Sequence, residues 1–498
     1  MARSTSNKGC WTCKDRKIAC DKRLPSCMNC ARSGRPCQGY GMRLSWPRSN
    51  DRKRAMISKI SDSNGDFCPS WLMDVFVNVY TSDIELSQRL VDTELLYSSM
   101  PHANTILENP RWTPFMLNRE QVNLFEYYER NVAKLLTAAG NPHVQSLMMR
   151  SVFTDSTPAS YAILYAIYAL SCLHLSDIVR AIEYKTKAYE AVQISASNYP
   201  DTKSVLQRII AVNFLALYES YASTVAAEHW AASVCYSKTA AIATFCAEQS
   251  YQGDLALILD WVYYYDTLAK FSVRHFDRST MGALLCAKKK HIQYAEMNSP
   301  DKTYIVPTIG CSLEVLSAIS AILDTALDYF QPPSESLSNT FDKLERRLKF
   351  ARQDLRINLL EDASSPHEYQ RVKDIAELYR LAGLVYLHRA GRGTATTSYA
   401  LQTIIDEAFA IMQRLDTCNR TFPLFIISCE ARTEAQRAVI LGVVQRNAAR
   451  PLSANTTRVW GFVERFWAQD DLDTEQEVDY AAKITAALSR TNSLPAFV

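Results

Sequence analysis

Apolar residues in the larger, C-terminal part of the chain recur at helical spacing. One such stripe, in which successive members lie three or four positions apart, consists of Leu206, Ile210, Phe214, Leu217 and Tyr221. This spacing is typical of one face of an α-helix. A second helix is expected over residues 255–271, which include Trp261 and the run 263–265. Alternating patterns of period two, which favour strands, are scarce, so the chain is predicted to be mostly α.

Turn and cap residues divide this part of the chain into separate helices. Thr157 followed by Pro158 is expected to cap the apolar run Tyr161–Leu175 at its start. That run has 15 residues, whereas a bilayer span needs about 20, so it predicts a buried core helix. Breaks are expected at residues 197–201, 298–302, 331–339, 391–398 and 450–456. No fixed repeat period indicates a solenoid.

Charge and glycine are both unevenly distributed. Residues 1–60 contain 15 Lys and Arg against 3 Asp and Glu, whereas the remainder carries 40 basic and 49 acidic residues. A small basic head on a mildly acidic body is expected when one end of a protein meets a polyanion. Five of the 14 glycines lie in the first 65 residues, and the glycine-poor remainder favours an all-α domain. No apolar segment typical of a signal peptide follows Met1, so we expect an intracellular protein.

Six of the 14 cysteines are concentrated in 28 positions near the N-terminus. They form the pattern C-x2-C-x6-C-x6-C-x2-C-x6-C and are Cys10, Cys13, Cys20, Cys27, Cys30 and Cys37. Zinc takes four tetrahedral ligands and accepts thiolates well. Six thiolates satisfy two zinc ions when two of the sulfurs bridge. A disulfide framework would need an oxidising compartment, and iron–sulfur sites use other spacings. The pattern therefore predicts two Zn²⁺ ions that supply most of the folding free energy of this segment.

The segment CWTCKDRKIACDKRLPSCMNCARSGRPC, residues 10–37, resembles the fungal Zn(II)2Cys6 binuclear cluster family over the whole motif. The resemblance implies that Cys10 and Cys27 bridge the two zincs. It further implies that Cys13 and Cys20 complete one site, and that Cys30 and Cys37 complete the other. It also implies a short helix after each CxxC pair and a loop turned by Pro25.

The residues between Cys13 and Cys20 are expected to read DNA. They include Lys14, Arg16 and Lys17, and Lys or Arg side chains recognise guanine in the major groove. In the family, the third and fourth residues after the second cysteine approach a CGG triplet, which implies Arg16 and, first of all, Lys17. Phosphate contacts are predicted for Lys22, Arg23, Arg32 and Arg35. The alternative is that these charges only keep a small domain soluble.

Residues 1–40 are thus predicted to be the DNA-binding domain, 41–66 a basic linker, and 67–498 an all-α regulatory domain. Within the linker, Arg52, Lys53 and Arg54 are candidates for nuclear import, for phosphate contacts, or for a merely solvated tether. No sustained heptad follows between residues 56 and 97, so a zipper-type dimer is not predicted. A helical stripe that includes Trp71 and Val75 is expected to dock on the body instead.

Four segments of the body resemble the fungal-specific transcription factor domain, in the branch of the acriflavine-sensitivity-control-like regulators. They are residues 135–153, 161–175, 261–276 and 422–441, and the linker at 37–47 also suits that branch. The resemblance implies an all-α regulatory domain and names no ligand.

Other residues of the body receive structural interpretations. The histidines His174, His229, His275 and His388 are expected in the core, and the eight remaining cysteines are expected to be small buried side chains. A redox pair of Cys418 and Cys429 is the alternative. Residues 467–480, WAQDDLDTEQEVDY, are interpreted as either an activation segment or, preferably, an acidic helix start.

These features predict a zinc-dependent, sequence-specific DNA-binding transcription factor located in the nucleus. Its expected partners are double-stranded DNA and the transcription machinery, with a homodimer as a possibility and no membrane. A zinc-cluster co-regulator or repressor that needs a partner to bind DNA is the alternative. Phosphate-loop, zinc-protease and hydrolase motifs are missing from the chain, so no enzymatic activity is expected.

Overall fold

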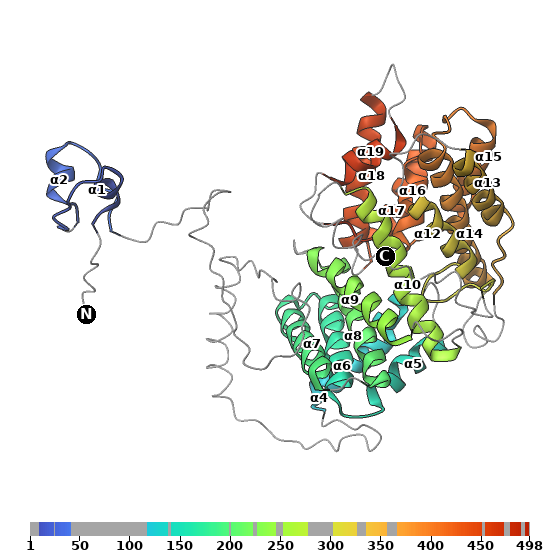
Figure 1. The fold of residues 1–498 in the computed structure, drawn as a ribbon, viewed down its shortest axis with the longest axis horizontal. Helices are drawn as coiled ribbons and strands as arrows, with labels where there is room; N and C mark the ends of the chain where they lie inside the picture. The colour runs from blue at the N-terminus through green and yellow to red at the C-terminus, as the bar shows by residue number, and fades with distance from the viewer. Residues whose placement is uncertain are drawn as a thin grey trace. The chain divides into compact units, whose positions relative to one another are not determined.

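The computed structural model of this protein divides the chain into two compact units, Met1–Ala103 and Asn104–Val498. It describes residues 9–23, 25–40, 117–137, 141–198, 201–222, 227–245, 252–276, 302–325, 335–355, 366–450, 454–472, 479–489 and 494–497. The described part of the first unit contains two short helices, α1 (Trp11–Asp15) and α2 (Met28–Arg32). The second unit, called the body below, is mostly helical in its described part (Figure 1).

The body contains the following helices: α4 (Arg119–Tyr127), η2 (Tyr128–Val132), η3 (Ala133–Leu135), α5 (Pro142–Phe153), α6 (Pro158–His174), α7 (Ile178–Asn198), α8 (Thr202–Tyr221), α9 (Ala227–Phe245), α10 (Gly253–Arg274), α12 (Leu313–Thr325), α13 (Glu335–Lys349), α14 (Pro366–Tyr386), η7 (Leu387–Gly391), α15 (Tyr399–Arg414), α16 (Thr421–Ser428), α17 (Glu434–Ala448), α18 (Ala454–Leu472) and α19 (Tyr480–Leu488). Within the described residues there is no strand, and only two isolated bridges occur, Tyr304 with Asp354 and Ile305 with Ser312. The mostly α fold class is confirmed.

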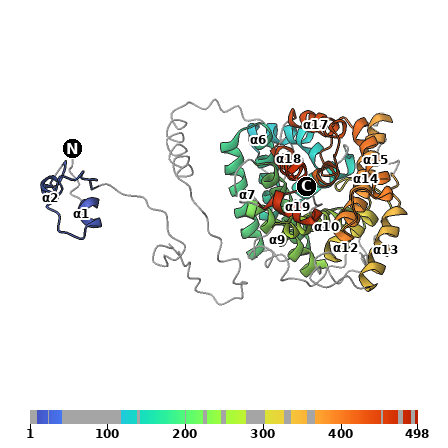
Figure 2. The same ribbon diagram turned by 90° about the horizontal axis from the view of Figure 1, so that it is seen from above.

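Helix α10 connects two groups of helices in the body. It packs against α8 and α9 on one side and against α12 on the other. Figure 2 shows α6 and α7 on one side of the body and α13, α14 and α15 on the opposite side, with α10 between them. Both groups bury their apolar side chains in one continuous core. A single cluster of this size explains why the body is one unit.

The expected helix starts and stripes agree with the structure. Thr157 caps α6 by accepting a hydrogen bond from the Ser160 backbone N–H, and Pro158 is the first helical residue. Helix α8 contains the whole stripe from Leu206 to Tyr221, and α10 contains residues 255–271. Helix α8 is buried on nearly every face, including Ile209 and Leu215. The apolar stripe therefore includes only part of the buried surface of α8, because α6, α9 and α10 all pack against this helix.

Two of the expected breaks are shorter than the turn chemistry predicted. Residues 335–339 form the first turns of α13, and residues 454–456 open α18. The polar residues at these positions favour turns in isolation. In the folded chain Phe341 and Leu344 of α13 are buried, and Asn455 and Thr456 of α18 are themselves buried. Tertiary packing thus outweighs local preference in both places.

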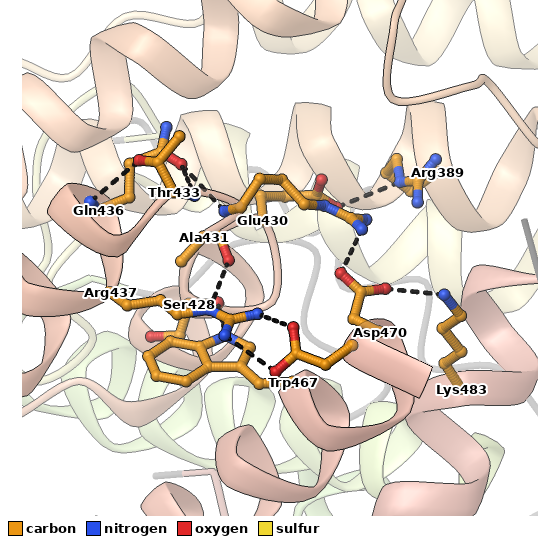
Figure 3. A network of polar contacts seen from close by, with 12 residues as sticks. Arg389, Ser428, Glu430, Ala431, Thr433, Gln436, Arg437, Trp467, Asp470 and Lys483 are labelled. Atoms are coloured by element: carbon orange, nitrogen blue, oxygen red, sulfur yellow. Dashed lines mark hydrogen bonds and ion pairs between the residues drawn. The ribbon is translucent and has the colours of Figure 1, made fainter. Parts of the chain in front are cut away.

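The acidic segment at 467–480 is part of two helices rather than one helix start. Trp467–Leu472 forms the end of α18, and Asp479 caps α19 by accepting from the Ala482 N–H. The Asp470 side chain is buried, and it pairs with Lys483 at 2.7 Å and with Arg432. Figure 3 shows Asp470 facing Lys483. The interpretation as a helix start holds for Asp479 but is wrong for residues 467–472.

The structure describes three of the four singled-out histidines. His174 Nδ1 lies 2.7 Å from the Tyr127 hydroxyl, and His275 lies between Tyr386 and Thr485. His388 is buried, with Nε2 3.4 Å from Glu345 Oε1. The His229 side chain lies outside the described residues.

Cys418 and Cys429 are not joined by a disulfide in this structure. Cys418 and Cys429 are fully buried and both are free thiols. Burial raises the pKa of both thiols, whereas a reactive cysteine needs exposure and a lowered pKa. Their interpretation as small buried side chains therefore fits better.

Several expectations fall on residues that the structure does not describe. The import candidates Arg52, Lys53 and Arg54, the stripe at 71–79, and the domain boundary at 66 all lie outside the described ranges. Among the described helices, none combines the length and apolar character that crossing a membrane requires.

Candidate metal centre and nucleic-acid interface

The first cysteine of each CxxC pair begins a helix. Cys10 is the N-cap of α1 and its Sγ accepts from the Cys13 N–H at 3.4 Å. Cys27 is the N-cap of α2 and accepts from the Cys30 N–H at 3.3 Å. Each helix therefore starts inside its CxxC pair, not after it as the resemblance implied. The reason is that the sulfur itself satisfies a free N–H of the first turn.

The two helices also end in the same way. After α1, Lys17 has a φ of 55° and the Ile18 N–H donates to the Cys13 carbonyl at 3.1 Å. After α2, Gly34 has a φ of 61° and the Arg35 N–H donates to the Cys30 carbonyl at 3.1 Å. This is the Schellman ending, whose left-handed residue normally is glycine. The two halves of the cluster thus share one backbone design, with a lysine where the second half has glycine.

The six cysteine sulfurs form two sets of four that share two members. One set contains Cys10, Cys13, Cys20 and Cys27, and the other contains Cys10, Cys27, Cys30 and Cys37. Within each set all sulfur atoms lie within 4.8 Å of one another. The two shared sulfurs, Cys10 and Cys27, are 3.6 Å apart.

This geometry fits two tetrahedral zinc ions. Zinc–thiolate bonds of about 2.3 Å place neighbouring sulfurs of a tetrahedron about 3.8 Å apart. The distances from Cys13 to Cys27 and from Cys10 to Cys30 are 3.6 and 3.8 Å. Two tetrahedra that share the edge between Cys10 and Cys27 therefore account for all six sulfurs.

Burial and backbone hydrogen bonds act differently on the thiols of Cys10, Cys13, Cys20 and Cys27. Burial raises the pKa of the Cys10, Cys13 and Cys27 thiols. At Cys20 burial acts in the same direction, but the N–H groups of Cys10 and Lys22 donate to its sulfur at 3.4 Å. These donors lower its pKa to about 7. The raised pKa values of Cys10, Cys13 and Cys27 mean that a bound cation must favour their ionisation, which Zn²⁺ does.

Hydrogen bonds outside the sulfurs hold the two halves together. Thr12 Oγ1 donates to the Pro36 carbonyl at 3.1 Å and accepts from the Gln38 N–H at 3.0 Å. Asn29 Nδ2 donates to the Ala19 carbonyl at 2.6 Å. These contacts join each helix to the other half of the sequence, so the cluster folds as one piece.

The basic residues singled out from the sequence are exposed around α1 and the loop that follows it. Lys14, Arg16, Lys17, Lys22 and Arg23 all have exposed side chains, as do Arg32 and Arg35. Lys14 Nζ lies 4.4 Å from the centre of the Trp11 ring, and Arg16 Nη1 donates to Ser33 Oγ at 3.1 Å. The sequence did not predict the left-handed backbone of Lys17 and Lys22, with φ of 55° and 58°. Glycines at the matching second-half positions, Gly34 for Lys17 and Gly39 for Lys22, are the sequence signal that could have indicated it.

Two family models match this chain. The Fungal specific transcription factor domain matches residues 123–491, which is most of the chain. The Fungal Zn(2)-Cys(6) binuclear cluster domain matches residues 8–47, which include all six clustered cysteines. The matched regions correspond to the described part of the body and to the cluster.

Curated proteins with similar sequences include a transcription factor and two regulatory proteins of fungi. Transcription factor iacI of Pestalotiopsis fici is 27% identical over 382 residues, which cover 76% of this chain and 95% of that protein. Arginine metabolism regulation protein II of Saccharomyces cerevisiae is 46% identical over 48 residues, 10% of this chain and 6% of that protein. Acriflavine sensitivity control protein acr-2 of Neurospora crassa is 38% identical over 60 residues, 12% of this chain and 10% of that protein. No solved structure matches.

Proposed function

This chain belongs to the fungal transcription factors that join a Zn(2)-Cys(6) cluster to a fungal specific transcription factor domain, and we propose that Arg16 and Lys17 read CGG-type triplets in its target genes. The chain is thus a DNA-binding transcription factor that carries two zinc ions, and it is not an enzyme. The proposal concerns which residues bind the metal and the bases, and how the protein finds its sites.

The single observation that carries the proposal is the difference between the two halves of the cluster. Both halves have the same helix start and the same helix ending. The first half places Lys14, Arg16 and Lys17 where the second has Ala31, Ser33 and Gly34. A shared backbone with unequal side chains assigns base reading to the first half, because guanine recognition needs Arg or Lys donors.

The metal ligands follow from the two sets of sulfurs. We assign Cys13 and Cys20 to one zinc and Cys30 and Cys37 to the other, with Cys10 and Cys27 bridging. The 3.6 Å separation of the two shared sulfurs supports this assignment. Zinc binding then holds α1 rigidly, so that the exposed side chains after it meet DNA in a fixed orientation.

We assign Lys22 and Arg23 to contacts with DNA phosphates. We further propose that the protein acts in the nucleus and that its body contacts the transcription machinery there. One triplet carries too little information for a genome, since each base pair contributes about 1–3 kcal/mol of discrimination. We therefore propose that the protein extends its site, either as a homodimer on two triplets or through the basic linker at 41–66.

The function is tested by selecting bound sequences from random DNA duplexes with full-length, zinc-loaded protein. CGG-type triplets should be enriched, singly for a monomer and as a fixed pair for a dimer. Lys17→Gly should lose this enrichment, at a cost of about 1–3 kcal/mol. Glycine suits the positive φ of this position, so the variant should keep two zinc ions by native mass spectrometry.

Lys22→Gly is the matched control, because Lys22 also has a positive φ and an exposed side chain. It should keep the selected sequence, bind all duplexes more weakly, and reduce the salt dependence by about one phosphate contact. A zinc-loaded Lys17→Gly protein that selects the unchanged triplet would contradict the base-reading assignment. Failure of the wild-type protein to select any sequence would favour a co-regulator that needs a partner.

A further inference from the structure

Two side chains from the second half of the cluster contact the segment of the first half that is proposed to read DNA. Arg16 Nη1 donates to Ser33 Oγ at 3.1 Å, and Ser33 is the C-cap residue of α2. Asn29 Nδ2, within α2, donates to the Ala19 carbonyl at 2.6 Å. Arg16 and Ala19 lie on either side of Lys17 in the sequence. The two bonds therefore hold both ends of the short stretch that contains Lys17.

The Ser33 hydroxyl is itself held by α2. It donates to the Asn29 carbonyl at 2.8 Å, and the Cys30 carbonyl lies 3.1 Å from it. A hydroxyl has one proton and two lone pairs, so Ser33 can donate to α2 and accept from Arg16 at the same time. Because Cys30 belongs to one of the two sets of sulfurs, this acceptor is anchored beside the metal centre.

A fixed acceptor changes what the Arg16 side chain can do. Arg16 is exposed, and a long exposed side chain loses conformational entropy when a ligand orders it. The bond to Ser33 restricts the side chain before DNA is bound. A guanidinium has five N–H donors, so one bond to Ser33 leaves enough donors for O6 and N7 of a guanine.

The bond made by Asn29 has a counterpart in the other half of the cluster. The halves correspond with a shift of 17 positions, as Cys10 and Cys27 do. With this shift Thr12 corresponds to Asn29 and Pro36 to Ala19, and Thr12 Oγ1 donates to the Pro36 carbonyl at 3.1 Å. Each helix thus makes the same bond to the opposite half, but the bond from Asn29 is the one of these two that reaches the segment with Lys17.

We propose that Ser33 and Asn29 are positioning residues for DNA reading, in which Ser33 orients the Arg16 guanidinium and Asn29 fixes the backbone that follows Lys17. The second half has Ala31, Ser33 and Gly34 where the first has Lys14, Arg16 and Lys17, so it supports the reading segment instead of duplicating it. This inference rests on the proposed base reading by Arg16 and Lys17.

The test compares two duplexes, one with a CGG triplet and one with CAA in its place, bound by full-length, zinc-loaded protein at one salt concentration. The ratio of the two affinities measures base discrimination. Ser33→Ala should lower this ratio about threefold to tenfold, as expected for the loss of one hydrogen bond. Its affinity for the CAA duplex should stay unchanged, because Ser33 carries no charge for phosphates. Ser33→Thr, which keeps the hydroxyl, should restore the ratio. An unchanged or higher ratio in Ser33→Ala would overturn the role of Ser33.

A double variant shows whether Ser33 acts through Arg16. Arg16→Met should lower the discrimination ratio, and adding Ser33→Ala to it should cause no further loss. Independent losses that multiply would overturn the positioning role. If Arg16→Met discriminates as the wild type does, base reading by Arg16 fails and this inference fails with it. If Arg16→Met loses discrimination while Ser33→Ala does not, only the positioning role fails.

Asn29→Ala and Thr12→Ala form a matched pair, because each removes one of the two corresponding bonds between the halves. Asn29→Ala should lower the discrimination ratio, whereas Thr12→Ala should leave it unchanged. Native mass spectrometry should find two zinc ions in both variants. Equal discrimination ratios in the two variants, or loss of zinc from Asn29→Ala, would show that Asn29 only stabilises the cluster and would overturn its positioning role.

Discussion

Cys10 and Cys27 differ from the other four clustered cysteines in belonging to both sets of sulfurs. Each unshared cysteine belongs to one set only. If each set binds one zinc ion, removal of a shared sulfur damages both sites, whereas removal of an unshared sulfur damages one. The ligand assignment therefore predicts unequal effects for chemically identical substitutions.

Cys27→Ser is expected to lose both zinc ions and to unfold residues 10–37, because the cluster depends on metal for its folding free energy. Cys20→Ser, the matched variant with an unshared sulfur, should retain at least one zinc ion. Native mass spectrometry of the two proteins measures the difference. Retention of two zincs by Cys27→Ser would disprove the bridging role.

His275 makes the stability of the body depend on pH. Its ring nitrogens lie 2.8 Å from the Tyr386 hydroxyl and 3.2 Å from Thr485 Oγ1, and burial lowers its pKa to about 3. In the unfolded chain the imidazole titrates near pH 6.5. Between these values the unfolded state binds the additional proton, so the free energy of unfolding falls as the pH drops below about 6.5.

This residue alone should reduce the free energy of unfolding by about 1.4 kcal/mol between pH 7.5 and pH 5.5. His275→Gln, although less stable at both pH values, should lack this part of the pH dependence. Urea unfolding of both proteins at the two pH values is the measurement. An identical pH dependence in the variant would show that His275 does not remain neutral in the folded body.

At the scale of elements, neighbouring carboxylates at the end of α18 have unequal roles. The Asp470 side chain is 4% exposed and pairs with Lys483, which is also 4% exposed. The Asp471 side chain is 58% exposed and pairs with Arg437. The buried pair joins α18 to α19, and Trp467 Nε1 joins α18 to the Ser428 carbonyl at 2.7 Å (Figure 3).

Asp470→Asn is expected to lower the free energy of unfolding of the body by about 3–5 kcal/mol, because it removes the carboxylate of a buried ion pair. Asp471→Asn should cost at most about 1 kcal/mol, since an exposed ion pair contributes little. Urea unfolding of the two variants and the wild type measures these differences in the free energy of unfolding. Equal, small losses would show that Asp470 acts as a surface charge and would revive the interpretation of these residues as an activation segment.

At the scale of the whole molecule, the two compact units are stabilised by different interactions. The cluster has a core made of cysteine side chains, with Tyr40 packed against it. The described helices of the body all contribute to one continuous apolar core. Metal therefore stabilises the first unit and hydrophobic burial the second.

Removal of zinc by a strong chelator should abolish DNA binding while leaving the helical signal and the unfolding temperature of the body nearly unchanged. Helices α1 and α2 have five residues each, so their loss hardly affects circular dichroism. Added zinc should restore binding. A clearly lower unfolding temperature of the body after chelation would show that the two units do not fold independently.

The sequence by itself determined the metal centre and the helical class of the body. The six cysteines lie within 28 consecutive positions, so their spacing alone brings them within reach of two ions. The periodic apolar residues of α8 and α10 likewise identify helices, because a helix is a local structure. Both inferences use residues close together in the chain, where the backbone limits the possible geometry.

Only the tertiary structure decided the features that depend on distant segments. A small cavity of the body is lined by Trp261, Thr308 and Asn419, and the burial of Asp470 depends on Lys483 of another helix. Such arrangements result from packing against neighbours far along the chain, and no local pattern of residues encodes them.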